Sequence, residues 1–135
     1  MDPQEKKVAL RAITSGLFVM TSTDGDELAA GGVNWLTQVS FEPPLVADDQ
    51  LEVAKAFFRS TSVEGDLLNG HRFERGVATG APILDEVPYW FEARVTDTVA
   101  RGDHTVYVAE VIGAGVRDAS RAPLNLRTTG MNFGG

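Results

Sequence analysis

The stretch YWFEARVTDTVARGDHTVYVAEVIGAGV, residues 89–116, decides the fold class of this chain. Side chains fall into two alternating sets along residues 89–99 and again along residues 104–116, a period of two that is typical of β-strands. Between them, the Arg-Gly-Asp sequence at 101–103 is typical of a tight turn. The stretch therefore predicts a hairpin of two long antiparallel strands.

A second hairpin is predicted nearer the N-terminus. Residues 17–23 are rich in β-branched and apolar side chains, and Asp-Gly-Asp at 24–26 forms a turn after which residues 27–35 pair back. Gly31 and Gly32 lie inside this second strand. Adjacent glycines there indicate either a bulge or a place where another group approaches the backbone closely.

Two short helices are expected beside these strands. Asp2, as N-cap, and Pro3, at the first helical position, begin a helix that Gly16 ends. Asp48 is expected to cap a second helix over residues 49–59. The apolar face of the second helix comprises Leu51, Ala54, Phe57 and Phe58.

The remaining residues predict little regular structure. Residues 60–88 are interrupted by glycines and are expected to be irregular, and residues 124–135 predict one short strand followed by Gly-rich coil. Strands and helices do not alternate, which disfavours a doubly wound fold. We expect residues 1–135 to form a single all-β domain with two short helices, either a barrel or a sandwich.

Composition and charge narrow the chemistry. The chain has no cysteine and only two histidines, which excludes disulfides, thiolate nucleophiles and cysteine-based metal sites, and we expect no metal. Its 12 cationic and 19 acidic residues give a net charge of −7, which disfavours binding to nucleic acid or to an anionic membrane. No apolar run has transmembrane length and the first residues form no signal-peptide core, so a cytoplasmic protein is expected.

Polar groups gather on residues 32–44, GVNWLTQVSFEPP, in what should be a buried β-stretch. No Gly-rich phosphate loop and no nucleophile elbow accompanies them. Buried amides and hydroxyls need hydrogen-bond partners, and a heteroaromatic ring would satisfy them while Trp35 formed an apolar wall. The polar side chains concerned are Asn34, Thr37 and Gln38. The alternative is an edge strand whose polar side chains are exposed to solvent. The spacing of the polar residues alone favours this alternative.

Four segments together resemble the flavin reductase-like, FMN-binding split-barrel family. The turn at 24–25 with residues 32–44 resembles the first hairpin and following strand of that family. Residues 102–111, GDHTVYVAEV, resemble its Gly-Asp-His strand, and residues 89–95, YWFEARV, resemble the strand before it. Residues 127–135, RTTGMNFGG, resemble the tail of one subgroup, and all four segments occur in the family's order.

The resemblance implies a Greek-key split β-barrel of six strands that forms homodimers, with FMN or FAD near the dimer interface. It also implies hydride transfer from NADH or NADPH to the flavin, and diffusion of the reduced flavin to a partner monooxygenase. By position, the residues bordering the flavin ring would be Val33, Asn34, Trp35, Leu36, Thr37, Gln38 and Ser40. His104 would lie near the nicotinamide, or else be a strand-end histidine bonded to a turn. Because the flavin carries the redox chemistry, no catalytic side chain is expected.

The chain departs from the family after Ala47. There the family continues with a strand, a Lys/Arg-x-Ser-x-Thr stretch, a helix and another strand, which supply cationic and hydroxyl groups to the flavin phosphate. This chain passes directly to Asp48 and Asp49. The segment is omitted from this sequence, lost by truncation of the gene, or removed by design, and omission is favoured because both flanks resemble the family.

If the deletion is real, weak or absent flavin binding is expected, because a phosphate needs cations or convergent N–H groups. Two alternatives to a reductase stay open. One is a non-catalytic FMN-binding or electron-carrying protein on the same barrel. The other is a structural relative that binds no flavin.

Overall fold

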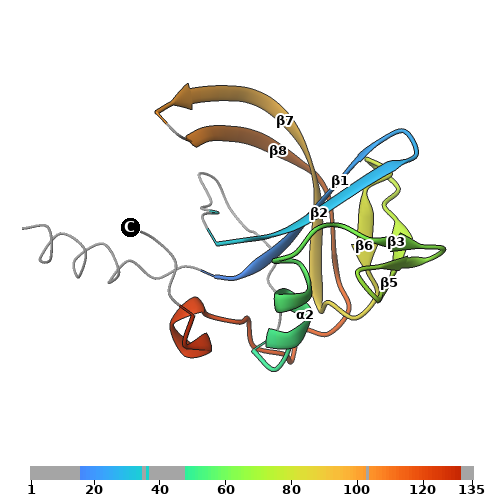
Figure 1. Cartoon of the computed structure of the whole chain (residues 1–135), viewed down its shortest axis with the longest axis vertical. Coiled ribbons are helices and arrows are strands. Elements are labelled where there is room, and N and C mark those ends of the chain that lie inside the picture. The colour runs from blue at the N-terminus through green and yellow to red at the C-terminus, as the bar shows by residue number, and fades with distance from the viewer. Residues whose placement is uncertain (1–15, 35, 37–47, 103, 132–135) are drawn as a thin grey trace, which may run out of the picture.

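The computed structural model describes residues 16–34, 36, 48–102 and 104–131. Within these ranges the chain is built mainly of strands, with one short α-helix and one 3-10 helix (Figure 1). The predicted all-β class is therefore confirmed. The helix predicted over residues 2–16 lies outside the described residues except for its last position.

Strands β1 (Phe18–Asp24) and β2 (Glu27–Val33) form the first predicted hairpin. Their antiparallel pairing runs without interruption along all seven residues of each strand. Gly25 has a φ of 60°, a left-handed conformation that glycine adopts at no steric cost, so it suits the two-residue turn. The bulge expected at Gly31 and Gly32 is wrong, and the alternative expectation, close approach of another group, holds at Gly32.

Helix α2 (Leu51–Ala56) is shorter than predicted. The expected cap at Asp48 is wrong, because Gln50 occupies the N-cap position and no side chain caps the helix. Asp48 and Asp49 both bond to residues 121–122 instead, the first through its backbone N–H and the second through its carboxylate. Contacts with a distant segment therefore hold these two residues outside the helix.

The helix ends at Ala56, three residues before the predicted end, and Phe57 is its C-cap. Phe57 has a φ of −101° and its carbonyl accepts the backbone N–H of Gly32 at 2.8 Å. A helix that continued would leave this carbonyl pointing along the helix axis toward its own next turn. The bond to β2 thus coincides with the end of the helix.

A four-stranded antiparallel sheet occupies the region predicted to be irregular, which corrects that expectation. Its strands pair in sequence order and are β3 (Val63–Glu64), β4 (Leu67–Leu68), β5 (His71–Arg75) and β6 (Pro82–Leu84). Strands of two to five residues are too short to display an alternating pattern, so only the turn glycines are visible in the sequence. Positive φ values at three of these glycines mark the turns: Gly65, Gly70 and Gly80.

Strands β7 (Tyr89–Arg101) and β8 (His104–Val116) form the long hairpin that the sequence predicts. The half of the hairpin nearest the turn is solvent-exposed at every described residue from 94 to 111. Figure 1 shows this half projecting from the other strands. We call residues 94–111 the arm.

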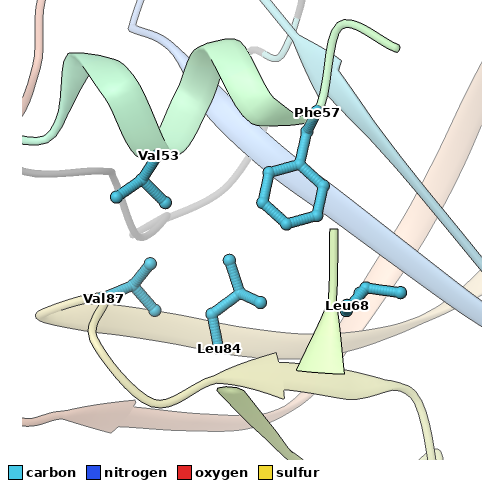
Figure 2. Close-up of a cluster of buried hydrophobic side chains, with 5 residues drawn as sticks. All are labelled: Val53, Phe57, Leu68, Leu84 and Val87. Atoms are coloured by element: carbon cyan, nitrogen blue, oxygen red, sulfur yellow. The ribbon is translucent and has the colours of Figure 1, made fainter. Parts of the chain in front are cut away.

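The main core lies between α2 and the strands that it covers (Figure 2). Side chains from the helix point toward side chains from the sheets and from the loop after β6. The members of this cluster are Val53, Phe57, Leu68, Leu84 and Val87. A smaller cluster joins the helix to the start of β1 and to the tail through Leu17, Ala54 and Leu124.

The tail contains no strand within residues 124–131, so the short strand expected in residues 124–135 is not found in this part, and residues 132–135 lie outside the described residues. A 3-10 helix, η1 (Leu126–Thr129), takes its place. The backbone N–H of Leu17 donates to the carbonyl of Leu124 at 3.3 Å, and Gly16 forms an isolated bridge with Asn125. The tail is thus attached to the start of β1 by few bonds.

Glu92 is a charged residue buried at the base of the long hairpin, with 5% of its surface exposed. Its carboxylate accepts hydrogen bonds from the backbone N–H and the hydroxyl of Thr79, both at 2.8 Å, and from the backbone N–H of Ala78 at 3.1 Å. A Cβ atom at Gly113 would lie 3.1 Å from Oε2, and a Cβ atom at Gly76 would overlap Oε1. Two glycines and the turn before β6 therefore form the space that holds this carboxylate.

Burial by itself raises the pKa of Glu92, since removal from water disfavours the charged form. The hydrogen bonds from Thr79 and Ala78 outweigh burial and leave the pKa of Glu92 below its ordinary value. The folded chain therefore binds this proton less tightly than the unfolded chain does. The carboxylate contributes stability above the unfolded pKa of about 4.3, and that contribution is lost as the pH falls through the folded pKa.

We expect Glu92→Gln to lower the free energy of unfolding by about 2 kcal/mol at neutral pH, because an amide cannot accept every bond that the carboxylate accepts. The variant should also lose part of the pH dependence of stability between about pH 5 and pH 3. Urea denaturation at a series of pH values measures both quantities. Glu110→Gln, at an exposed position of the arm, is the matched control. Equal pH profiles for Glu92→Gln and the natural chain would contradict the assignment.

Candidate functional site

The predicted flavin-binding stretch begins where β2 ends. Val33 is the last residue of β2 and pairs with Phe18, and both Val33 and Asn34 are partly buried. Leu36 is 38% exposed. The other predicted residues lie outside the described part of the chain: Trp35, Thr37, Gln38 and Ser40.

The outer edge of β2 is closed by the chain that follows α2. Gly32 donates its backbone N–H to the carbonyl of Phe57 at 2.8 Å. The hydroxyl of Thr61 accepts the backbone N–H of Ala30 at 3.0 Å and donates to the carbonyl of Ala30 at 3.2 Å. The carbonyl at the end of the helix and the hydroxyl of Thr61 thus form hydrogen bonds with backbone groups of β2. Without them, these groups would face solvent at the edge of the strand. β2 is held on both edges where it enters the predicted site.

Groups at the end of β2 have the hydrogen-bonding capacity that a flavin ring requires. The side chain of Asn34 carries an acceptor oxygen and two donor hydrogens, and the β1–β2 ladder ends one residue before it. The edge of a flavin ring carries both donors and acceptors, so this donor set fits the ring. The phosphate needs cations or convergent N–H groups, and the segment that the family resemblance implies for this role is expected to be absent after Ala47. The fit therefore holds for the ring half of the ligand.

His104 is the first residue of β8, exposed at the tip of the arm and opposite Arg101. The tip of the arm and the end of β2 lie apart in Figure 1. The structure therefore does not bring His104 beside Val33 and Asn34 within one molecule.

His71 and Glu86 form a pair that the sequence did not single out. The imidazole Nδ1 of His71 is hydrogen-bonded to the carboxylate of Glu86, and the side chain of Gln50 donates to the carbonyl of Glu86 at 2.6 Å. The rings of His71 and Phe57 lie 5.7 Å apart, centroid to centroid. These contacts join the four-stranded sheet to α2, which accounts for the pair structurally. No short motif connects residues 15 positions apart, so sequence reasoning had no signal for it.

Other features of the described ranges offer no competing site. Among these residues no three His, Asp or Glu side chains gather as a metal site requires. Within the same ranges, no helix has the length and the apolar character needed to cross a membrane. A hollow beside α2 contains none of the predicted flavin-binding residues and is lined by Glu52, Lys55, Ala56 and Arg59.

Comparison with known proteins places the chain among flavin reductases. A family model described as flavin reductase like domain matches residues 45–134. FMN reductase (NADH) SmoA of Agrobacterium fabrum is 30% identical over 130 residues, an alignment that covers 82% of this chain and 75% of SmoA. Stachydrine N-demethylase reductase subunit Stc3 of Rhizobium meliloti is 26% identical over 132 residues, covering 82% of this chain and 57% of Stc3. The chain spans only 42% of another Rhizobium meliloti relative.

The alignments also bear on the segment expected to be absent after Ala47. The alignment with SmoA has 130 positions but takes in only 82% of the 135 residues here, so it includes positions that SmoA fills and this chain does not. The family match begins at residue 45, immediately before the expected gap. The length of the SmoA alignment therefore agrees with residues that SmoA has and this chain lacks.

Solved structures share the fold. NADH:FAD oxidoreductase SgcE6 of Streptomyces globisporus superposes with a TM-score of 0.71 at 19% identity, over 93% of this chain and 85% of SgcE6. BorF, the flavin reductase component of a bacterial two-component tryptophan halogenase, superposes with a TM-score of 0.70 at 20% identity, over 90% of this chain and 99% of BorF. This likeness confirms the predicted split-barrel class. The shared fold, the match over residues 45–134 and the SmoA alignment together make this chain a member of the flavin reductase-like domain family.

Proposed function

We propose that this chain is an oxidoreductase that reduces a flavin with NADH or NADPH and supplies the reduced flavin to a monooxygenase component. The observation that carries the proposal is the alignment with SmoA, an FMN reductase (NADH), at 30% identity over most of both chains. We favour FMN as the flavin, with FAD as the alternative that the name of SgcE6 represents. The names of Stc3 and BorF describe reductase parts of larger systems, which supports a partner enzyme for this chain.

The chain's own contribution is to bind and orient. When bound, the flavin supplies the acceptor for a hydride from the nicotinamide. Asn34 and backbone groups beyond β2 would hydrogen-bond the edge of the ring, and Trp35 would form an apolar wall beside it, as the family resemblance implies. The other residues that the resemblance would place at the ring are Val33, Leu36, Thr37, Gln38 and Ser40. No side chain acts as acid or base in this scheme.

A homodimer is part of the proposal. Every described residue of the arm is exposed, and its tip lies apart from the end of β2 in the same molecule (Figure 1). In a dimer the arm of one molecule can carry His104 to the nicotinamide side of the site in the other. We place the protein in the cytoplasm. The chain has no cysteine and so forms no disulfide that would need an oxidising compartment.

One observation favours a second candidate, a structural relative that binds no flavin. The alignment with SmoA includes positions that have no residue here, and in the family the segment expected at the gap binds the phosphate. A net charge of −7 makes loss of cations there costly for an anionic ligand.

An assay of the purified chain with FMN and each nicotinamide separates these candidates. A reductase oxidises NADH or NADPH only when flavin is present, which the loss of nicotinamide absorbance measures. Binding of FMN without nicotinamide oxidation would indicate the non-catalytic carrier. A colourless chain that titrates no FMN or FAD would overturn the proposal and leave the flavin-free relative.

Asn34→Leu is expected to raise the Kd for FMN about three- to ten-fold, because loss of one hydrogen bond to the ring costs roughly 0.5–1.5 kcal/mol. Titration of FMN fluorescence measures the affinity. The melting temperature is the control, since the residue lies beyond the β1–β2 ladder and is not in either core cluster. An unchanged Kd would remove Asn34 from the site.

His104→Ala is expected to raise the KM for the nicotinamide about three- to ten-fold, the cost of one hydrogen bond, while the Kd for FMN stays within about two-fold. Steady-state kinetics with saturating flavin measure the KM. Thr105→Ala, the next residue of the arm and also exposed, is the control. A weakened FMN affinity with an unchanged KM would show that His104 serves the flavin instead.

A further inference from the structure

The C-terminal end of β2 is in direct contact with the aromatic ring of Phe58, which follows α2. Gly32 pairs with Val19 of β1 and donates its backbone N–H to the carbonyl of Phe57 at 2.8 Å. A Cβ atom added at Gly32 would lie 2.6 Å from Cε1 and 2.8 Å from Cζ of Phe58. Those distances are far shorter than the 3.5–4.0 Å of favourable carbon contacts. The ring of Phe58 therefore occupies the space that a side chain at position 32 would fill.

The backbone that carries this ring is fixed. Phe57, the preceding residue, is 2% exposed in the main core and is bonded to Gly32, so this part of the chain cannot move away without opening the core. Thr61 bonds both backbone groups of Ala30 on the same edge of β2. The backbone on both sides of Phe58 is thus held against β2, which keeps the ring of Phe58 beside the strand.

Phe58 itself is 40% exposed, which sets it apart from the core residues around it. A ring that stays partly in water contributes less burial energy than a core phenylalanine, because hydrophobic stabilisation follows the apolar area removed from water. Its effect on β2 is geometric, since it limits how the strand can tilt. Val33, the last residue of β2, and Asn34, the residue after it, follow Gly32 directly and are the first of the predicted flavin-binding stretch.

We propose that the contact between Gly32 and the ring of Phe58 is a positioning contact for flavin binding, which sets the direction in which β2 ends at Val33 and carries Asn34 beyond it. The inference rests on the proposed function. Gly32 and Phe58 act through Val33 and Asn34 and do not touch the ligand themselves. A larger residue at 32 would displace either the ring of Phe58 or the strand.

The adjacent glycine offers a matched control. A Cβ atom at Gly31 meets no atom within 4 Å, whereas one at Gly32 meets the ring of Phe58. Both residues lie in β2 and pair with β1, so alanine changes strand propensity alike at the two positions. Gly31→Ala and Gly32→Ala therefore differ in the contact with Phe58.

The experiment compares Gly31→Ala, Gly32→Ala, Phe58→Ala, Phe58→Tyr and the double variant Gly32→Ala/Phe58→Ala. We expect Gly32→Ala to raise the Kd for FMN about ten-fold, with Gly31→Ala and Phe58→Tyr within about two-fold of the natural chain. Phe58→Ala should weaken binding about three-fold. The double variant should resemble Phe58→Ala instead of showing the product of the two effects, because both changes act on one contact.

A second measurement separates this inference from the proposed function. Hydrogen exchange at the amides of Val33 and Asn34 should quicken in Gly32→Ala and not in Gly31→Ala, whether or not flavin binds. If the natural chain binds no flavin, the proposed function fails and the exchange data still decide whether the contact positions the strand. Equal behaviour of Gly31→Ala and Gly32→Ala in both measurements, or multiplicative effects in the double variant, would overturn the inference.

Discussion

The packing of the buried Phe57 side chain is the interaction on which the first hairpin, the helix and the four-stranded sheet depend. Its ring lies in the main core between α2 and the strands below it (Figure 2). Its carbonyl holds β2 through Gly32, and its ring also packs against His71 of β5. One residue therefore joins the first hairpin, the helix and the four-stranded sheet. Removing a buried ring of this size costs about 3–5 kcal/mol, which is comparable to the whole stability of many small domains.

The long hairpin divides into two parts with different physical character. Its base is held by the buried carboxylate of Glu92, whose hydrogen bonds keep it charged in spite of burial. The arm beyond it has no core of its own and exposes several large apolar side chains: Val95, Val99, Val106, Tyr107, Val108 and Val111. Large exposed apolar patches are uncommon on monomeric proteins and often mark an interaction surface, and among these side chains Val99 and Val106 lie opposite each other. This contrast is the physical basis for expecting a second molecule beside the arm.

Family membership gives a physical reason for the expectation that no catalytic side chain is needed. A flavin reductase relies on its cofactor for the redox step, so the protein needs groups that place a ring and leave one face open. Such groups are ordinary amides, backbone atoms and apolar walls. The contact of Phe58 with Gly32 belongs to the same class, since it acts by placing the strand that carries Asn34. For such a protein, the placement of the groups that hold the flavin ring matters more than the presence of reactive side chains.

Both hairpins were predictable from the sequence, because alternation along a strand and a glycine at the turn are properties of a few neighbouring residues. Family resemblance, carried by residues in the hairpins and the tail, also identified the fold class and the stretch beginning at Val33. Of that stretch, the structure describes Val33, Asn34 and Leu36, and it places His104 away from them in the same molecule.

The tertiary structure alone decided the remaining features. The four short strands within residues 60–88 exist because neighbouring strands and the helix cover them, and strands of this length carry no period of their own. The bounds of α2 follow from bonds to residues 121–122 and to Gly32, which are distant in sequence. The roles of Gly32 and Glu92 likewise depend on groups that only the folded chain brings within contact distance. Local patterns record forces between near neighbours, whereas these features arise from contacts that form when the whole chain packs.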